Sequence, residues 1–485
     1  MTLISRNSRL DIEAYHKHWM RMSSFWTDRT ELARLTQKEV AVQELSRELR
    51  QNEIILGFDG LEYDPAHAVY QDIHKTGGTG EVRAYHAIFM GLNGSGKTGL
   101  GKNVVFQDNL VQRFLEPFFM YDKKGEAPES KKPSFSSASE EAVRKKVDSL
   151  FAKFNPPIHR HGYDILTVAP VLMKPKGGAG LPGVDRYFGI SLDMLKFISR
   201  HDPDECTRIF MMLIGEDPNN PNSVDIIKRL IRGHLNNVQK YAEMVDLVER
   251  ISMKQGLVNT GGRIQRKIKN ARYDRVLSDR TEDQLDILNE MWSRRGKGGV
   301  AFRGRARSSG SESYIDMQFD AMLMTLMWTI LYDSGDYHKF RSPTAVLRSQ
   351  NGTAIYIPEL HSLAPDGKFS YTTDFIRSFL TEARTSGIDF GGDTQEASTV
   401  DKEFFSQFRY IYCCGAVTEN NAKVLVQHHI RQEIINNVLR ELDGRKKTSI
   451  GMEPPESAAI ETETKDYKTF RVMPSQSGWQ AMTKA

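Results

Sequence analysis

Residues 91–98 carry the residue types and spacing best suited to chemistry in this chain. Their sequence, GLNGSGKT, satisfies the pattern G-x-x-x-x-G-K-[ST]. Glycines allow a loop to wrap closely, so that successive backbone N–H groups face phosphate oxygens. The positive end of a following helix would face the same phosphates. We therefore expect ATP, or a similar nucleoside triphosphate, to be bound by Gly91, Asn93, Gly94, Ser95, Gly96, Lys97 and Thr98.

The flanking segments support this interpretation. The apolar run at residues 87–90 predicts a buried strand that leads into the loop, and residues 103–114 predict a helix after it. Lys97 would then reach the β- and γ-phosphates, and the Thr98 hydroxyl would be a ligand of Mg²⁺. ATP and Mg²⁺ are the predicted cofactors. A glycine turn without function would not require this strand–loop–helix context.

A second set of candidate residues lies far downstream, at the ends of other predicted elements. A P-loop ATPase needs an acidic residue at the end of a second strand and a group that senses the γ-phosphate. A predicted strand at residues 354–357 leads to Glu359, and a helical pattern ends at Arg384. Gln395 follows, before another apolar run at residues 410–414.

This order of segments resembles the HerA/FtsK superfamily of ring-forming, DNA-pumping ATPases, especially its HerA-like and conjugation-type branches. In that family an apolar strand ends in Asp-Glu-Ala-His, a helix ends with an arginine and a glycine, and a strand ends in Thr-Gln. Residues 359–361, 382–387 and 394–395 match these segments in the same order. The resemblance covers roughly residues 80–440, most clearly around the phosphate loop and in residues 315–415.

The resemblance implies a role for each matching residue. Glu359 would polarise the attacking water, and Gln395 would sense the γ-phosphate or orient that water. Arg384 would stabilise charge on the phosphoryl group in a neighbouring subunit's site. The family's ring is usually a hexamer. The implied function is ATP-dependent movement of DNA through a homo-oligomeric ring, in DNA transfer, end processing or genome packaging, with a nuclease, membrane-channel or capsid partner.

One position departs from the family pattern. Pro358 stands where the family has the Asp that helps to hold Mg²⁺. Thr98, phosphates and waters could still hold the ion, because Mg²⁺ commonly keeps several waters. Two other functions stay open. One is a nucleotide-gated scaffold with little hydrolysis, which Pro358 favours; the other is a protein-remodelling or secretion ATPase, whose pore loops would favour aromatic and apolar residues.

Two basic segments lie between the nucleotide motifs, at residues 263–272 and 294–307. A translocase needs basic groups that grip backbone phosphates without reading sequence. A solvated basic helix and a charged loop are the alternative interpretation. The predicted contacts to non-sequence-specific DNA are Arg263, Arg266, Lys267, Lys269, Arg294, Arg295, Arg303 and Arg305.

Apolar strand-like runs alternate with helical patterns, which indicates an α/β protein with a mainly parallel sheet. With the phosphate loop, this predicts a RecA-like P-loop NTPase core. Amphipathic spacing between residues 9 and 52 predicts helices before that core. We expect an N-terminal helical segment at 1–80, the start of the core at 81–122, a flexible serine-rich insertion at 123–142, a core continuation with a helical elaboration at 143–310, the second part of the core at 311–447 and a C-terminal tail at 448–485.

The composition is that of a soluble globular protein, with 39% apolar residues, 26% charged residues and a net charge of +4. The three cysteines, Cys206, Cys413 and Cys414, lack the spacing of a disulfide framework or a zinc site and favour a reducing compartment. No apolar run reaches the roughly 18 residues that a membrane span needs. We therefore expect a cytoplasmic chain without a transmembrane segment.

Overall fold

The computed structural model describes residues 53–72, 84–92, 94–106, 117–136, 140–155, 157–175, 180–304, 314–340, 353–364, 371–386, 388–400, 402–415, 417–428, 430–442 and 445–475. The helices expected between residues 9 and 52 lie outside this part of the chain, as do Asn93 and Arg305.

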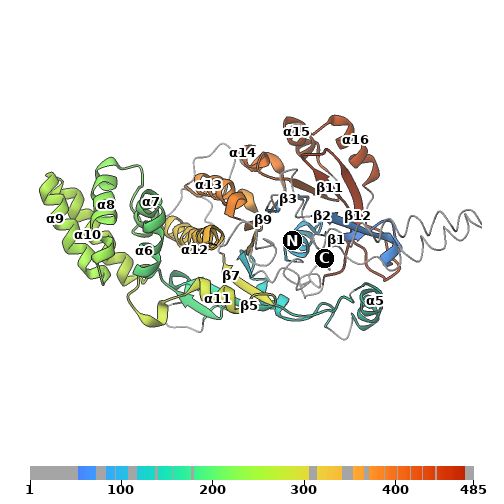
Figure 1. Cartoon of the computed structure of the whole chain (residues 1–485), viewed down its shortest axis with the longest axis horizontal. Coiled ribbons are helices and arrows are strands. Elements are labelled where there is room, and N and C mark those ends of the chain that lie inside the picture. The colour runs from blue at the N-terminus through green and yellow to red at the C-terminus, as the bar shows by residue number, and fades with distance from the viewer. Residues whose placement is uncertain are drawn as a thin grey trace, which may run out of the picture.

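The described strands form one 12-stranded sheet in the order β2-β1-β12-β11-β10-β3-β9-β8-β4-β7-β5-β6 (Figure 1). Every neighbouring pair from β10 to β6 is parallel, which confirms the predicted α/β fold with a mainly parallel sheet. The parallel strands are β3 (His86–Met90), β4 (Phe118–Asp122), β5 (Asp164–Pro170), β6 (Arg186–Phe188), β7 (Gly298–Arg303), β8 (Thr353–Ile357), β9 (Ile388–Thr394) and β10 (Tyr410–Cys414).

The other side of the sheet is antiparallel. It contains β1 (Glu53–Phe58), β2 (Ala68–Asp72), β11 (Glu456–Glu461) and β12 (Tyr467–Val472). These strands correct two expectations, a helical segment that extends to residue 80 and a tail that begins at residue 448. The polar composition of the C-terminal segment suggests a tail, but its short apolar runs are buried once β11 pairs with β10.

Helices and loops bury both faces of the sheet. Along β3, Ile88 and Met90 belong to one hydrophobic core, whereas Ala87 and Phe89 belong to a second core, because successive side chains of a strand point to opposite faces. The helices outside the lobe described below are α3 (Lys97–Val105), α5 (Glu141–Phe151), α11 (Ile287–Ser293), α12 (Tyr314–Phe340), α13 (Tyr371–Ser386), α14 (Lys402–Phe405), α15 (Glu419–Gln427) and α16 (Gln432–Glu441).

A helical lobe extends from one end of the sheet, at the left in Figure 1. Side-chain caps delimit its helices: Asp202 accepts hydrogen bonds from the backbone N–H groups of Asp204 and Glu205, and Asn220 accepts one from Ser223. Proline follows both caps at the first helical position, where its missing N–H is not needed. The lobe helices are α6 (Leu192–His201), α7 (Pro203–Leu213), α8 (Pro221–Gly233), α9 (Tyr241–Gln255) and α10 (Val258–Tyr273).

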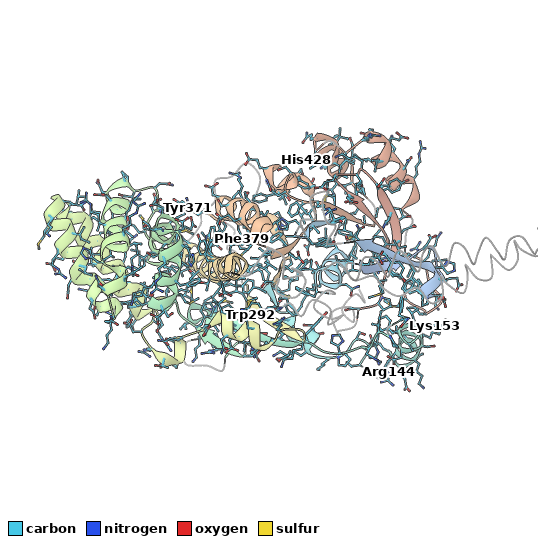
Figure 2. The ribbon with its side chains drawn as sticks, viewed as in Figure 1. Arg144, Lys153, Trp292, Tyr371, Phe379 and His428 are labelled. Atoms are coloured by element: carbon cyan, nitrogen blue, oxygen red, sulfur yellow. The ribbon has the colours of Figure 1, made fainter. Side chains whose placement is uncertain are left out.

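Helix α12 joins the lobe to the sheet. It packs against α6 and α7 on one side and against α13 on the other. Trp328 of α12 donates a hydrogen bond from Nε1 to Glu205 of α7 (3.2 Å), and its ring lies 6.3 Å from that of Phe379 on α13. Phe379 is labelled in Figure 2. Although α12 is long, none of the helices that the structure describes combines the length and apolar character of a membrane span.

The segment expected to be a flexible insertion, residues 123–142, is folded where the structure describes it. Both carboxylate oxygens of Asp122 accept backbone N–H bonds from the turn that follows β4. The backbone carbonyl of Ser130 accepts a 2.9 Å bond from the N–H of Tyr163, and the side chains of Ser130 and Ser134 are buried. Serine content alone suggests mobility, but these serines are buried, and their carbonyl groups accept hydrogen bonds from Tyr163 and from the guanidinium of Arg160.

Candidate active site

The phosphate loop connects β3 to α3 in the predicted strand–loop–helix order. Gly94 and Gly96 have φ values of 76° and 83°, a region in which a Cβ causes strain. A Cβ at Gly91 would lie 2.4 Å from Oγ of Ser95 and 2.6 Å from the carbonyl oxygen of Cys414. Glycine at these positions therefore lets the loop turn tightly across the end of β3.

Lys97 opens α3, so this helix begins earlier than the one expected at residues 103–114. The residue is 6% exposed, and within the described part of the chain its ammonium group has no hydrogen bond or ion pair. The Ser95 hydroxyl is buried and also lacks a hydrogen-bond partner there. An unpaired buried cation is unfavourable unless an anion neutralises it. The start of α3 therefore suits an anion such as a phosphate.

The parallel sheet brings the downstream candidates to the same edge. β9 pairs with both β3 and β8, and β4 pairs with β8. Glu359 and Gln395 follow β8 and β9, and Lys123 follows β4. Ligands of open α/β sheets bind at this carboxyl end of the strands. The fold thus gathers the phosphate loop, Glu359 and Gln395, which are far apart in sequence.

Glu359 has a strained backbone that a neighbouring carboxylate holds in place. Its φ and ψ are 52° and 50°, in the left-handed region that a residue with a side chain rarely adopts. Its N–H donates a 2.9 Å bond to Oδ1 of Asp393, a fully buried residue of β9. The other carboxylate oxygen of Asp393 accepts a 2.6 Å bond from the Tyr356 hydroxyl. Sequence reasoning gave no role to Asp393; the signal was a carboxylate near the end of a strand that is buried along its whole length.

The Glu359 carboxylate also faces two lysines. One oxygen forms an ion pair with Lys123, and the other lies 3.4 Å from the ammonium nitrogen of Lys124. Burial raises the pKa of Glu359, but the hydrogen bond and charge of Lys123, with a smaller effect from Lys124, outweigh it and leave the pKa lowered. The carboxylate is therefore ionised, and each of its oxygens faces a lysine ammonium group.

A partly buried ion pair connects α3 to the turn after β4, which carries Lys123. Lys102 is 2% exposed, and its ammonium nitrogen lies 2.7 Å from a carboxylate oxygen of Glu126. Burial raises the pKa of Glu126, but the charge and hydrogen bond of Lys102 lower it by more. The phosphate-loop helix and the turn that carries Lys123 are therefore mechanically linked.

The Thr-Gln segment reaches the site through Thr394. The Thr394 hydroxyl donates a 3.0 Å bond to the carbonyl of Glu396 and lies 3.5 Å from Nδ1 of His361. Burial lowers the pKa of His361, which favours its neutral form. Gln395 is half-buried beside this pair. The backbone of Arg384 belongs to α13, but its side chain lies outside the described part of the structure.

The C-terminal segment also contacts the phosphate loop, which the sequence did not suggest. The guanidinium of Arg445 donates a hydrogen bond to the carbonyl oxygen of Gly94. The ring of Pro455 would lie 3.9 Å from a Cβ at Gly96. The segment that leads into β11 therefore supports the loop from the side opposite to β9.

Carboxylates engage four of the seven described basic residues that were predicted to contact DNA. Arg263 and Lys267 both lie 2.8 Å from carboxylate oxygens of the buried Glu216. In the second segment, Arg294 pairs with Glu290 and Asp164, Arg303 lies 3.9 Å from Asp122, and Arg295 lies over the ring of Trp292. On α10, Arg266 and Lys269 are exposed. The assignment of these residues to DNA stays a prediction.

The oxygen donors at this edge suit Mg²⁺, a hard cation. The Thr98 hydroxyl has no hydrogen bond within the described part of the chain, and its carbonyl oxygen lies 3.5 Å from the Tyr356 hydroxyl that also bonds Asp393. The described residues include no group of three His, Cys, Asp or Glu side chains that could hold a metal. Thr98 with Glu359 or Asp393 therefore fits Mg²⁺ that arrives with nucleotide phosphates, rather than an ion held by the protein alone.

Comparison with known proteins gives matches in structure. No family model matches the chain, and no curated protein matches its sequence. The chain is similar to VirB4 of Thermoanaerobacter pseudethanolicus, with 12% identity and a TM-score of 0.49 over 89% of this chain and 99% of that one. It is also similar to the genome packaging NTPase B204 from Sulfolobus turreted icosahedral virus 2 in complex with AMPPCP, with 9% identity and a TM-score of 0.33 over 81% of this chain and 99% of that one.

Proposed function

We propose that this protein binds ATP with Mg²⁺ at the carboxyl edge of its sheet, hydrolyses it, and uses the cycle to move DNA through a homo-oligomeric ring. The observation that supports nucleotide binding best is Lys97, a buried cation at the start of α3 with no counter-charge in the described part of the chain. A triphosphate would supply that charge, and the glycine-rich loop would supply backbone N–H donors.

Hydrolysis would depend on Glu359. Its ionised carboxylate can polarise a water that attacks the γ-phosphate, provided that Lys123 and Lys124 release it. An arriving triphosphate offers those two lysines another anion. Bound Mg²⁺ would bridge phosphate oxygens and neutralise developing charge. Gln395, beside Thr394 at the end of β9, would orient the water or sense the γ-phosphate.

Pro358 does not leave the site without a second carboxylate. Asp393 enters from the adjacent strand, β9, and its oxygens bond the backbone of Glu359 and the Tyr356 hydroxyl. A buried carboxylate with two fixed donors is well oriented. We infer that Asp393 sets the position of Glu359, so the loss of the Asp expected at residue 358 does not prevent turnover.

DNA movement is the second half of the proposal. The resemblance to DNA-pumping ATPases and the basic character of the helical lobe support it. Arg384 would act on the neighbouring subunit's nucleotide, in a ring that the family likeness suggests is a hexamer. The described cysteines are buried and free, in keeping with action in the cytoplasm. DNA transfer, end processing and genome packaging would each use such a motor with a different partner.

A nucleotide-gated scaffold is the second candidate, and one observation favours it. Both oxygens of Glu359 face lysines. If nucleotide binding does not displace those lysines, the carboxylate cannot polarise water, and the protein would bind ATP with little hydrolysis.

Steady-state ATP hydrolysis tests the proposal, measured with and without long duplex DNA for the native chain, Lys97→Ala and Glu359→Gln. We expect DNA to stimulate the native rate. Lys97→Ala should lose ATP binding, whereas Glu359→Gln should keep binding and lose turnover by about 10²-fold or more, because it lacks the general base. Binding of ATP by the native chain without turnover, with or without DNA, would support the scaffold instead.

A further inference from the structure

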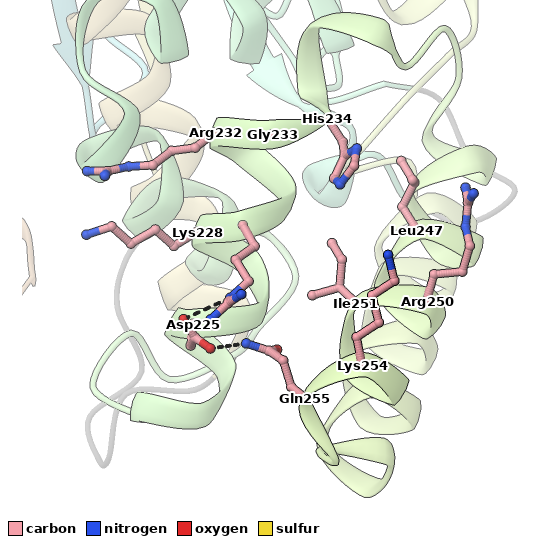
Figure 3. A pocket seen from close by; sticks show the side chains of 11 residues that line it. Asp225, Lys228, Arg232, Gly233, His234, Leu247, Arg250, Ile251, Lys254 and Gln255 are labelled. Atoms are coloured by element: carbon pink, nitrogen blue, oxygen red, sulfur yellow. Dashed lines mark hydrogen bonds and ion pairs between the residues drawn. The ribbon is translucent and has the colours of Figure 1, made fainter.

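A groove of about 660 Å³ lies between α8 and α9 in the helical lobe (Figure 3). It is separate from the carboxyl edge of the sheet and outside the basic segments that the sequence analysis selected. Five lysines and arginines and one histidine line it, with a single acidic residue. The lining residues are Asp225, Lys228, Arg229, Arg232, Gly233, His234, Leu247, Arg250, Ile251, Lys254 and Gln255.

The α9 side of the groove carries its unpaired charge. Arg250 and Lys254 are exposed, one helical turn apart, and have no ion pair with another described residue. Figure 3 shows His234 directed toward the space between the two helices, whereas Lys254 extends along α9. The apolar floor includes Ile251, which is 8% exposed. The groove therefore combines a packed floor with free cations at its rim.

The α8 side is only partly neutralised. Lys228 and Arg232 share one exposed carboxylate, Asp204, at 2.9 and 2.7 Å, and both extend along the outer side of α8 (Figure 3). Arg229 lies 3.3 Å from Asp225, which also accepts a hydrogen bond from Gln255. Two carboxylates thus form ion pairs with three cations of α8, so the groove keeps a net positive charge.

We propose that this groove binds the phosphate backbone of duplex DNA. Exposed cations spread over two helices match an extended polyanion better than a compact one, because each phosphate contact is weak and many are needed. The identification of the polyanion as DNA rests on the proposed function. An acidic polypeptide is the other occupant that such charge could attract.

The groove contrasts with α10, whose sequence is equally basic. Arg263 and Lys267 of α10 are held by Glu216, so their charge serves the lobe itself. Arg250 and Lys254 have no such partner among the described residues. Helix α10 also keeps two exposed cations, Arg266 and Lys269, whereas Arg250 and Lys254 line a groove together with cations of α8. The groove, rather than the number of basic residues, should decide which surface holds DNA.

The test compares two charge-matched double variants of the full chain. One is Arg250→Gln with Lys254→Gln; the other is Arg266→Gln with Lys269→Gln, which removes two exposed charges from α10. Affinity for a fluorescent duplex is measured from about 50 to 200 mM salt, a range in which phosphate contacts weaken steeply. We expect the groove variant to bind about tenfold or more weakly and its salt slope to fall by about 2. The α10 variant should lose less, and circular dichroism should show that both variants keep the native fold.

Three results would overturn the inference. One is a groove variant that binds DNA as the native chain does; another is one weakened no more than the α10 variant. The third is displacement of the duplex by poly-L-glutamate as efficiently as by unlabelled duplex, which would assign the groove to acidic polypeptides. Absence of any DNA binding by the native chain would instead count against the proposed function itself, so the two failures are distinguishable.

Discussion

Two regions of this protein carry positive charge that no described carboxylate neutralises, and they carry it in different ways. At the carboxyl edge of the sheet, Lys97 is buried and unpaired, while Lys102 and Lys123 are in ion pairs. In the helical lobe, Arg250 and Lys254 are unpaired and exposed. In each region, carboxylates form ion pairs with some of the cations, and the other cations have no described carboxylate partner.

The difference in burial indicates a difference in ligand. A buried cation acts through a low dielectric and is little screened by salt, so one such group can hold a compact phosphate strongly. Exposed cations are screened and act additively along an extended chain of phosphates. The sheet edge therefore suits a nucleotide, and the lobe suits a polymer.

The largest expected effect comes from removing Asp393, whose carboxylate positions Glu359 at the carboxyl edge of the sheet. Asp393→Ala removes the acceptor for the Glu359 N–H and for the Tyr356 hydroxyl, so the strained backbone of Glu359 should relax. We expect kcat to fall by about 10²-fold, as misplaced catalytic groups usually cause, while ATP binding remains. Single-turnover hydrolysis and nucleotide titration measure the two quantities.

Tyr356→Phe is the matched control for that substitution, because it keeps the Asp393 bond to Glu359. We expect it to lose less than tenfold in kcat. Native turnover by Asp393→Ala would show that Asp393 does not position Glu359.

An intermediate effect should follow from removing the carboxylate that orders the lobe. Glu216 is buried and holds Arg263, Lys267 and the Ser223 hydroxyl. Glu216→Gln should lower the free energy of unfolding by about 2 kcal/mol, since it uncouples charge-assisted bonds whose donors are partly exposed. Denaturant unfolding followed by circular dichroism measures this change, and ATP affinity should stay native. Equal stability of the variant would mean that the α10 cations are not held by Glu216.

The smallest expected effect is a change in the pH dependence of hydrolysis on removal of Lys123, which is paired with Glu359. Because the hydrogen bond and charge of Lys123 lower the pKa of that carboxyl against the opposing effect of burial, Lys123→Ala should raise it. Glu359 acts as a base only when ionised, so the acidic limb of the pH–rate profile should move to higher pH. Lys132→Ala, at an exposed position after the 3-10 helix Ala127–Lys131, should leave the profile unchanged. A limb that moves to lower pH would contradict the assignment.

Four of the parallel strands could be predicted from sequence because they are buried strands that read as apolar runs. The runs at residues 87–90, 165–171, 354–357 and 410–414 correspond to β3, β5, β8 and β10. The antiparallel strands β1, β2, β11 and β12 were missed, and so were the parallel strands β4, β6 and β7. In β2, β11 and β12 polar and apolar residues mix, and only pairing with distant strands makes them recognisable.

The candidate site could be predicted in part. The residues of the phosphate loop are consecutive in sequence, so their types and spacing are enough to predict the loop. The position of Asp393 beside Glu359 depends on which strands are neighbours, and sequence order does not contain that information. For the same reason, the basic run on α10 looked available, although Glu216, far from it in sequence, holds two of its members.

The pairing of β1 with β12 has a consequence for how this chain is made. Gly57 lies opposite Val472, so the antiparallel side of the sheet closes only after nearly all of the described chain has left the ribosome. The segment beside the phosphate loop arrives just before β12. Strand β1 therefore keeps an unpaired edge until β12 has been synthesised. Pairing between segments so far apart in sequence is slow and leaves the chain exposed to aggregation. Folding of this protein should accordingly be more sensitive to shortening after residue 455 than the position of its nucleotide motifs suggests.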